Sequence, residues 1–310
     1  MDLTEWLLES DPSIRWQVMR DLLDAPADAV AAERSRVANE GVGARLLTLQ
    51  ADDGYWGGDE YGIDGDRRGT HWILQDLRRL GADPDSEPVR AAIERVRDGV
   101  TWSGFDDRPY FAGEEEECVN GGVLAHAAYF GELGGGSEKI IDMLLEQQLP
   151  DGGWNCEPAE ESQRSSFDST ICVIEGFLAY ERATSEPRAD VAESRRRGEE
   201  YLLERGLYRR RSTGDLVLDR YLDFAFPPYW HYDVLRALDY FRQTGEAPDP
   251  RIDGAIGLVL DQRLDDGRWP AAKPRRGQVF FPLDEPEGEP SRWNTLRALR
   301  VLRWAGRPVE

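Results

Sequence analysis

The chain has 310 residues, with 60 acidic and 38 basic side chains and a formal net charge of −22. This length and a hydrophobic fraction of 40% are sufficient for a large folded core, which excludes a mainly disordered chain. Because so acidic a protein repels phosphate backbones and anionic lipids, the composition also argues against nucleic-acid binding and peripheral membrane binding as main functions.

Apolar residues recur at intervals of three and four along most of the chain, and no comparable stretch alternates with a period of two. The sequence therefore predicts an all-α protein. In chain order, helices are expected at 12–24, 41–50, 68–80, 116–132, 137–149, 166–183, 190–205, 229–243, 251–263 and 290–304.

Two kinds of predicted helix alternate. Segments 119–130 and 169–180 are apolar almost all round, which favours burial, whereas segments 86–98 and 188–205 carry a wide charged face. We assign the first kind to an inner ring and the second to an outer ring, which the short segment 3–9 closes. The inner helices are expected at 12–24, 68–80, 116–132, 166–183, 229–243 and 290–304.

The connections alternate in length. Those from an inner to an outer helix are short turns, whereas the return connections run about fifteen to twenty-five residues, which is uncommon unless such loops are functional. Because helix direction alternates, the long loops are expected on one face, at the N-terminal ends of the inner helices. Helix N-termini attract anions, so we expect this face to bind a carboxylate or a diphosphate.

A short turn repeats where the predicted outer helices end. It reads LQADDGYWGG at 49–58, QQLPDGGWNCE at 147–157 and DQRLDDGRWP at 261–270. A repeat at this spacing is typical of stacked helical hairpins, and its Asp-Gly step supplies the tight turn. In the third copy Arg263 stands where the first two copies have Gln, and Gln262 precedes it.

The Gln-x3-Gly-x-Trp turns that begin at Gln50 and Gln148 resemble the repeated turn of squalene and oxidosqualene cyclases, which also occurs in protein prenyltransferase β subunits. The resemblance extends over most of the chain, and we expect residues 1–310 to form one domain. It implies an (α/α)6 toroid whose inner helices enclose a deep apolar cavity. It also implies a prenyltransferase-like or squalene-cyclase-like enzyme acting on an isoprenoid or other hydrophobic small molecule, such as a prenyl diphosphate.

Two chemical signatures of these families differ here. The Asp-x-Asp-Asp acid motif of the cyclases is absent from the sequence, in which residues 105–107 read FDD. In the prenyltransferase zinc motif, Asp168 occupies the Asp position, but Thr170 stands in place of the Cys and Asn294 in place of the His. These departures favour the alternative of a non-catalytic toroid that binds a lipid or a protein partner. A six-hairpin glycosidase with paired carboxylates is a third alternative, which fits the acidity but not the repeated turns.

Uncommon side chains gather at the predicted N-terminal ends of the inner helices. Asp168, His231 and Asp233 are candidate catalytic residues, because a carboxyl buried in an apolar wall keeps its proton and can donate it. The structural alternative is that Asp168 and Asp233 cap their helices and that His231 forms a hydrogen bond with a neighbouring loop. We expect substrate-binding roles for His71, Trp72, Cys118, Asn120, Trp230, Tyr232, Trp293 and Asn294.

A metal site is a further hypothesis for the same face. Asp168 and Cys172 are four residues apart and so share a helix face, where they and His231 form a candidate zinc site. Cys156 is the other sulfur within reach. The structural alternative makes Cys172 a small core residue, Asp168 a helix cap and Cys156 a loop thiol.

Two basic clusters, at 209–211 and 273–276, fall in the long loops. They are suited to hold a diphosphate by charge-assisted hydrogen bonds, with a solvated surface as the alternative.

The N-terminus has no basic segment followed by an apolar one, and no run of 18 apolar residues occurs. We therefore expect neither a signal peptide nor a transmembrane segment. An odd set of three cysteines fits a reducing compartment, so a cytoplasmic location is expected.

Overall fold

The computed structural model describes residues 2–62, 65–157 and 163–308. Helices form most of the regular structure, which confirms the all-α prediction. The only strands in this part of the chain are two-residue segments, which pair as two antiparallel ribbons within the long loops. They are β1 (Thr101–Trp102) with β2 (Arg108–Pro109), and β3 (Trp269–Pro270) with β4 (Pro290–Ser291).

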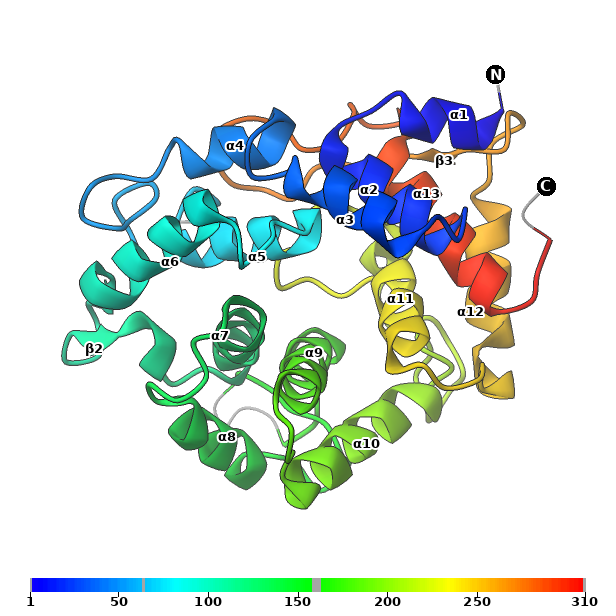
Figure 1. The fold of residues 1–310 in the computed structure, drawn as a ribbon. Coiled ribbons are helices and arrows are strands. Elements are labelled where there is room, and N and C mark those ends of the chain that lie inside the picture. The colour runs from blue at the N-terminus through cyan, green and yellow to red at the C-terminus, as the bar shows by residue number, and fades with distance from the viewer. Residues whose placement is uncertain (1, 63–64, 158–162, 309–310) are drawn as a thin grey trace.

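Two rings of six helices surround a common axis among the described residues (Figure 1). The inner helices are α2 (Pro12–Asp21), α5 (Thr70–Leu80), α7 (Glu117–Phe130), α9 (Phe167–Ala183), α11 (Val234–Thr244) and α13 (Arg292–Trp304). The outer helices are α1 (Leu3–Leu8), α4 (Gly41–Leu47), α6 (Glu87–Gly99), α8 (Ser137–Glu146), α10 (Ala189–Leu203) and α12 (Asp253–Asp261). The chain therefore folds as the predicted α/α toroid.

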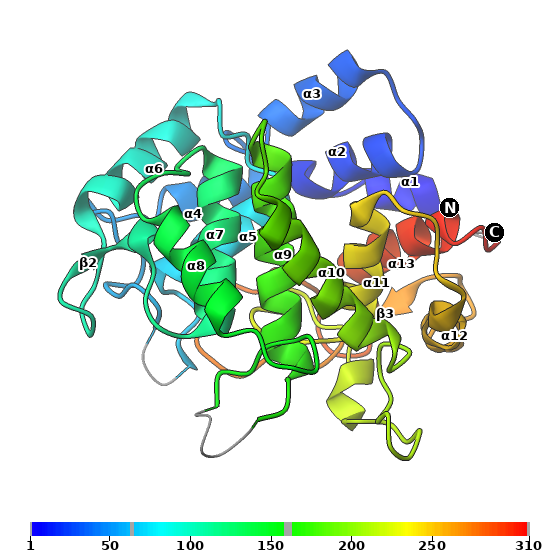
Figure 2. The ribbon, with the colours of Figure 1, turned by 90° about the horizontal axis from the view of Figure 1, so that it is seen from below.

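The helix α3 (Ala27–Ser35) is absent from the sequence-based prediction. None of its residues is buried, so it lacks the apolar stripe that marks the other helices. It lies at the end of the toroid away from the long loops (Figure 2). Arg34 fixes it there by donating hydrogen bonds to the Gly81 carbonyl and the Tyr129 hydroxyl, both at 3.0 Å. The helix therefore covers the C-terminal ends of α5 and α7.

The backbones of α7 and α9 pack directly against each other. A Cβ atom at Gly121 would lie 2.5 Å from the Cys172 carbonyl oxygen, and one at Gly176 would clash with the Gly121 backbone. Both helices are apolar on nearly every side, as predicted, because one face meets the partner and the other meets the outer ring.

The three repeated turns make the same contacts. In each, the Trp is fully buried, its indole N–H donates to a carbonyl of the preceding outer helix, and its backbone N–H donates to a Thr hydroxyl of the next inner helix. The indole bonds are Trp56 to Leu46 at 2.7 Å, Trp154 to Leu144 at 2.6 Å and Trp269 to Val259 at 2.6 Å. The backbone bonds are Trp56 to Thr70 at 3.2 Å, Trp154 to Thr170 at 3.1 Å and Trp269 to Thr295 at 3.0 Å. Each turn thus ties an outer helix to the next inner helix.

Arg263 replaces the glutamine in the third turn without loss of its contact. Gln50 and Gln148 donate to the carbonyl four residues ahead at 3.0 and 2.6 Å, and Arg263 donates to the Gly267 carbonyl at 3.2 Å. Gln262 turns away and donates to Leu222 at 2.8 Å. A donor of either type therefore closes the turn.

The loop that precedes α11 crosses the middle of the toroid (Figure 1). Phe226 stacks on Trp293 of α13 with ring centroids 4.0 Å apart, and Tyr229 contacts Trp72 of α5 edge-on at 5.5 Å. These contacts hold the loop against α13 and α5.

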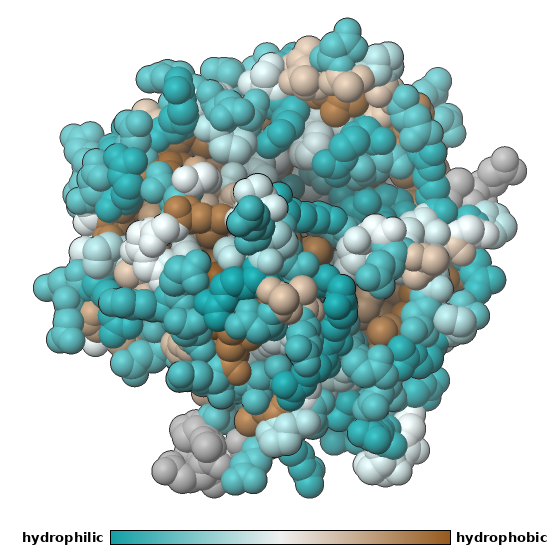
Figure 3. All heavy atoms as spheres, turned by 60° about the horizontal axis from the view of Figure 1, so that its bottom comes forward, coloured by the Kyte–Doolittle hydropathy of each residue, from teal (hydrophilic) through white to brown (hydrophobic). Residues whose placement is uncertain are grey.

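The face shown in Figure 3 is mainly hydrophilic, with smaller hydrophobic areas between the charged side chains. Among the helices that the structure describes, none combines the length and the apolar character that a membrane crossing requires.

Candidate functional site

The central cavity has a volume of about 640 Å³ and lies toward the C-terminal ends of the six inner helices. It is therefore at the opposite end from the long loops. Its wall contains the arginines Arg20, Arg34, Arg78, Arg79, Arg182, Arg242, Arg297 and Arg300 and the carboxylates Asp21, Glu175 and Asp239.

This charged wall differs from the apolar cavity that the resemblance implied. Most of the arginines occupy the last turns of inner helices, where a cation compensates the negative end of the helix dipole. Closing the ring brings these helix ends together around one space. The result is an excess of positive charge inside a strongly acidic protein.

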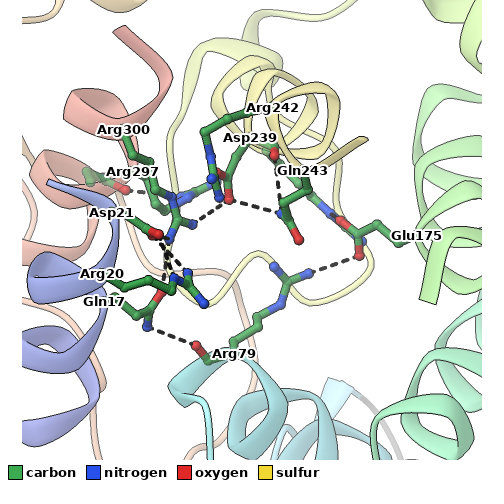
Figure 4. A network of polar contacts seen from close by, with 12 residues as sticks. Gln17, Arg20, Asp21, Arg79, Glu175, Asp239, Arg242, Gln243, Arg297 and Arg300 are labelled. Atoms are coloured by element: carbon green, nitrogen blue, oxygen red, sulfur yellow. Dashed lines mark hydrogen bonds and ion pairs between the residues drawn. The ribbon is translucent and has the colours of Figure 1, made fainter. Parts of the chain in front are cut away.

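Glu175 of α9 is the principal carboxylate on one side of the cavity (Figure 4). Arg236 donates to its two oxygens at 2.8 and 3.0 Å, while Arg79 and Arg78 lie 3.4 and 3.6 Å from Oε2. Burial opposes ionisation, but Arg236 and Arg79 outweigh it and hold the pKa of Glu175 at about 2. The carboxylate is therefore charged at neutral pH and shared among three guanidinium groups.

Asp239 of α11 has a similar place on the other side (Figure 4). It forms ion pairs with Arg300 and, at 2.9 Å, with Arg242. Burial favours its neutral form, yet these arginines lower its pKa. Arg300 also donates to Gln17 at 2.9 Å and lies 3.5 Å from Asp21, so it connects α13 to both α11 and α2.

The positive charge in the wall is incompletely compensated. The Nε–H groups of Arg78, Arg79 and Arg300 are buried and have no hydrogen-bond partner within the described part of the chain. Burial lowers the pKa of each of these arginines, which shows that desolvation of the charged form outweighs the nearby carboxylates. These Nε–H groups have almost no accessible surface, so an anion in the cavity would compensate the charge of the guanidinium groups and not bond to the Nε atoms themselves.

Aromatic and aliphatic side chains complete the wall. Trp16, Leu178, Phe226, Tyr240 and Trp293 contribute apolar surface beside the arginines. The cavity therefore presents both a cationic part and an apolar part to one occupant.

A second cavity, here called the rim pocket, lies on the long-loop face and has a volume of about 800 Å³. It adjoins the first turn of α9 and the loop that follows α10. The residues of interest in its lining are Glu116, Cys118, Cys156, Asp168, Arg209, Arg210, Arg211, Arg220 and Trp230. The basic cluster at 209–211 thus lies at a pocket, as the diphosphate hypothesis requires, although Arg211 pairs with Glu204 at 2.9 Å.

Asp168 and His231 are joined through Arg220. The guanidinium donates to Asp168 at 2.8 and 3.2 Å and to His231 Nδ1 at 3.1 Å, and the Tyr232 N–H donates to Asp168 at 2.7 Å. Asp168 does not cap α9, because the Ser166 side chain accepts the first-turn N–H groups. Burial and the cations Arg275 and Arg220 lower the pKa of His231 to about 3, so its imidazole is neutral.

Cys172 makes different contacts from its predicted zinc partners. Its Sγ lies 3.5 Å from the Trp230 carbonyl and 3.5 Å from Arg236 Nη2. Arg220 thus connects Asp168 to His231, whereas Cys172 contacts a different arginine, Arg236. The zinc role expected for Asp168, Cys172 and His231 stays a prediction.

Asp233 is fully buried and caps α11, accepting a hydrogen bond from the Arg236 backbone at 2.6 Å. Arg297 lies 3.5 Å from the same carboxylate oxygen, while Oδ2 has no partner among the described residues. Burial raises the pKa of Asp233 despite the nearby Arg297. These contacts correspond to the structural alternative, and its catalytic role stays a prediction.

Three of the predicted substrate-binding residues hold loops in place. Asn120 exchanges hydrogen bonds with the Glu114 backbone at 2.9 and 3.0 Å. Asn294 donates to Phe224 and Pro270 carbonyls. Tyr232 donates to the Leu207 carbonyl at 2.6 Å.

The remaining five divide between packing and cavity walls. His71 is buried against the Tyr110 hydroxyl at 3.1 Å, and burial lowers its pKa to about 3. Trp72 packs among aromatic rings and under Arg67, whose guanidinium carbon is 4.6 Å from the ring centroid. The cavity-lining residues are Trp293 in the central cavity and Cys118 and Trp230 in the rim pocket.

Sequence reasoning missed Asp76 of α5, which is buried and lines a small pocket of about 100 Å³ beside Arg67, Phe226 and Tyr229. Burial raises its pKa to about 8, against the weaker opposing effect of Arg79, and Oδ1 has no partner in the described ranges. The available signal was its spacing, because Asp76 lies three residues after Ile73 and therefore on the apolar face.

No family model matches the sequence, and no curated protein matches it. Among solved structures, the chain is similar to the apo form of the type II terpene cyclase MstE from Scytonema. The sequence identity is 19% and the TM-score is 0.46, and the match covers 95% of this chain and 86% of that chain.

Proposed function

We propose that the protein binds an amphipathic organic anion in the central cavity, with a phosphate or diphosphate group against the arginines and a hydrophobic body against the aromatic wall. The observation that carries this proposal is the lining itself, in which eight arginines face three carboxylates. The net charge of the whole chain is −22, so the positive cavity reverses the character of the rest of the molecule.

Electrostatics in a partly desolvated space favour such a ligand. Guanidinium groups form strong, directional hydrogen bonds with phosphate oxygens, and these bonds gain strength where water is excluded. The guanidinium groups of Arg78, Arg79 and Arg300 line the cavity, and a phosphate beside them would compensate positive charge that the three wall carboxylates balance only in part. Their bonds to an anion would offset the cost of burying several cations together.

A prenyl diphosphate is the member of this class that the repeated turns suggest. It combines two phosphates with a hydrocarbon chain, which matches the two parts of the cavity wall. A volume of about 640 Å³ is also within the usual range of about 300–1,000 Å³ for small-molecule sites.

Acid catalysis is a second candidate function, of the kind that a squalene-cyclase-like enzyme requires. Asp76 supports it, because a carboxyl with a pKa of about 8 keeps its proton at neutral pH and can act as a general acid. Phe226 lies in the walls of both the central cavity and the small pocket that contains Asp76. The Asp76 pocket therefore adjoins the central cavity at Phe226.

Calorimetric titration with farnesyl diphosphate, inorganic pyrophosphate and farnesol tests the binding proposal. We expect farnesyl diphosphate to bind more tightly than either of the other two, because it alone fills both parts of the wall. Arg79→Gln should weaken its binding about tenfold or more, the loss expected for one hydrogen bond to a charged group. Arg211→Gln, at an exposed arginine of the rim pocket, is the matched control.

Equal affinities of the wild type and Arg79→Gln for farnesyl diphosphate would contradict the central site. Loss of binding only in Arg211→Gln would instead locate the ligand in the rim pocket. Circular dichroism of each variant checks that the fold is retained.

A further inference from the structure

A separate cluster of potential metal ligands lies in the wall of the rim pocket. The Sγ atoms of Cys118 and Cys156 and a carboxylate oxygen of Glu116 all lie within 4.8 Å of one another. Glu116 precedes the first residue of α7, Cys118 is in its first turn, and Cys156 belongs to the loop before α9. The cluster therefore joins two segments that are 38 residues apart in the sequence.

Hydrogen bonds fix the Cys156 sulfur in place. It accepts one from the Cys118 backbone N–H at 3.3 Å and one from the Ser169 hydroxyl at 3.3 Å. The Ser169 hydroxyl in turn accepts from the Cys156 N–H at 3.3 Å. These two donors hold the Cys156 sulfur beside the start of α7.

The two thiols and the carboxylate lie close enough to share one cation. Metal binding displaces the thiol protons, because a divalent cation between the sulfurs favours their thiolate forms. Glu116 adds a carboxylate, with its Oε2 3.9 Å from Cys118 Sγ.

We propose that Glu116, Cys118 and Cys156 bind a thiophilic divalent cation, for which zinc is the expected ion. Zinc prefers tetrahedral sites with thiolate and carboxylate ligands, at about 2.3 Å for sulfur and about 2.0–2.2 Å for oxygen. Those bond lengths place ligand atoms about 3.5–4 Å apart, so small side-chain rotations are enough to close the site.

Three protein ligands leave one tetrahedral position open. All three residues line the rim pocket, so the open position faces that space. Arg209, Arg210 and Arg220 line the same pocket and favour an anionic donor there. The site thus has the open coordination that distinguishes ligand-binding zinc sites from closed structural ones.

Cobalt(II) titration of the full-length protein tests the proposal, after reduction with a phosphine and removal of metals by a chelator. Thiolate-to-cobalt charge-transfer absorption reports sulfur ligation, and elemental analysis reports zinc stoichiometry. We expect one equivalent of zinc, and a charge-transfer band that is lost in Cys118→Ser and in Cys156→Ser. Glu116→Gln should keep the band but weaken binding, because it removes only the oxygen ligand.

Cys172→Ser is the matched comparison, since Cys172 is the third thiol and contacts Arg236 instead. The band should persist in this variant. A band lost only in Cys172→Ser would place the metal with Asp168 and His231 and overturn the proposal. Absence of a band in the reduced wild-type protein would overturn the proposal too. This holds also if Cys118 and Cys156 are found to form a disulfide in air. Circular dichroism separates loss of metal from loss of fold.

Discussion

Arg79 of α5 and Glu175 of α9 contact each other in the wall of the central cavity, with Nη2 of the arginine 3.4 Å from Oε2 of the carboxylate (Figure 4). Glu175 is shared with Arg236 and Arg78, so one negative charge serves three guanidinium groups. This imbalance gives the cavity its affinity for anions in our proposal.

Replacing Glu175 should destabilise the fold, and an anion should restore the lost stability. Glu175→Gln leaves the arginines uncompensated, a change that costs about 3–5 kcal/mol when a buried pair is broken. Pyrophosphate should restore much of the thermal stability by occupying the cavity. Glu200→Gln is the control, because its pair with Arg251 is about half exposed and contributes about 0–1 kcal/mol. Equal unfolding midpoints for the two variants would contradict the role assigned to Glu175.

Asp76 should make stability fall as the pH rises. Between the ordinary aspartate pKa of 3.8 and the folded pKa of about 8, the folded protein keeps a proton that the unfolded chain releases. The free energy of unfolding therefore decreases across this range as pH rises. Asp76→Asn removes this contribution, so urea unfolding at about pH 5 and about pH 8 should show a smaller decrease in the variant. Parallel pH profiles would show that Asp76 ionises normally.

The link between Asp168 and Arg220 should be a positioning contact for the rim pocket. Asp168→Asn should lower the free energy of unfolding by about 1–3 kcal/mol, a moderate value because the Arg220 side chain is 33% exposed. Arg220→Gln should destabilise the Asp168→Asn variant less than it destabilises the wild type. Unfolding measurements on the two single variants and the double variant would detect this difference. Cobalt binding should survive Asp168→Asn. Its loss would instead support the zinc role predicted for Asp168.

The third repeated turn should accept a glutamine. Arg263→Gln restores the residue of the other two copies, and the shorter donor can reach the Gly267 carbonyl as Gln50 reaches Gly54. We expect a change of less than about 0.5 kcal/mol for Arg263→Gln, and a cost of about 1 kcal/mol for Arg263→Ala, which removes the donor. Thermal unfolding of both variants provides the measurement. Equal losses of stability in Arg263→Gln and Arg263→Ala would mean that the guanidinium group stabilises the fold by contacts other than its bond to Gly267.

The architecture of the rings could be predicted from the sequence because local patterns carry it. Helical periodicity identified the buried and the charged helices, and the Asp-Gly and Trp spacing identified where outer helices end. The exception is α3, whose weak apolar pattern gave no signal. Within the turns, Thr70 and Thr170 were not recognised as partners of the tryptophans, since a hydrogen bond to the next helix has no fixed spacing.

The sequence by itself determined an acidic all-α chain of alternating inner and outer helices, because these properties depend on composition and on neighbours along one helix. The tertiary structure alone decided where the charges and thiols meet. Most arginines of the cavity look in sequence like cations at helix ends, and only ring closure brings Arg79 and Arg300 to one space. Cys118 and Cys156 likewise meet only because the loop before α9 folds back onto the start of α7. Contacts between distant segments depend on how the helices pack, which no local pattern encodes.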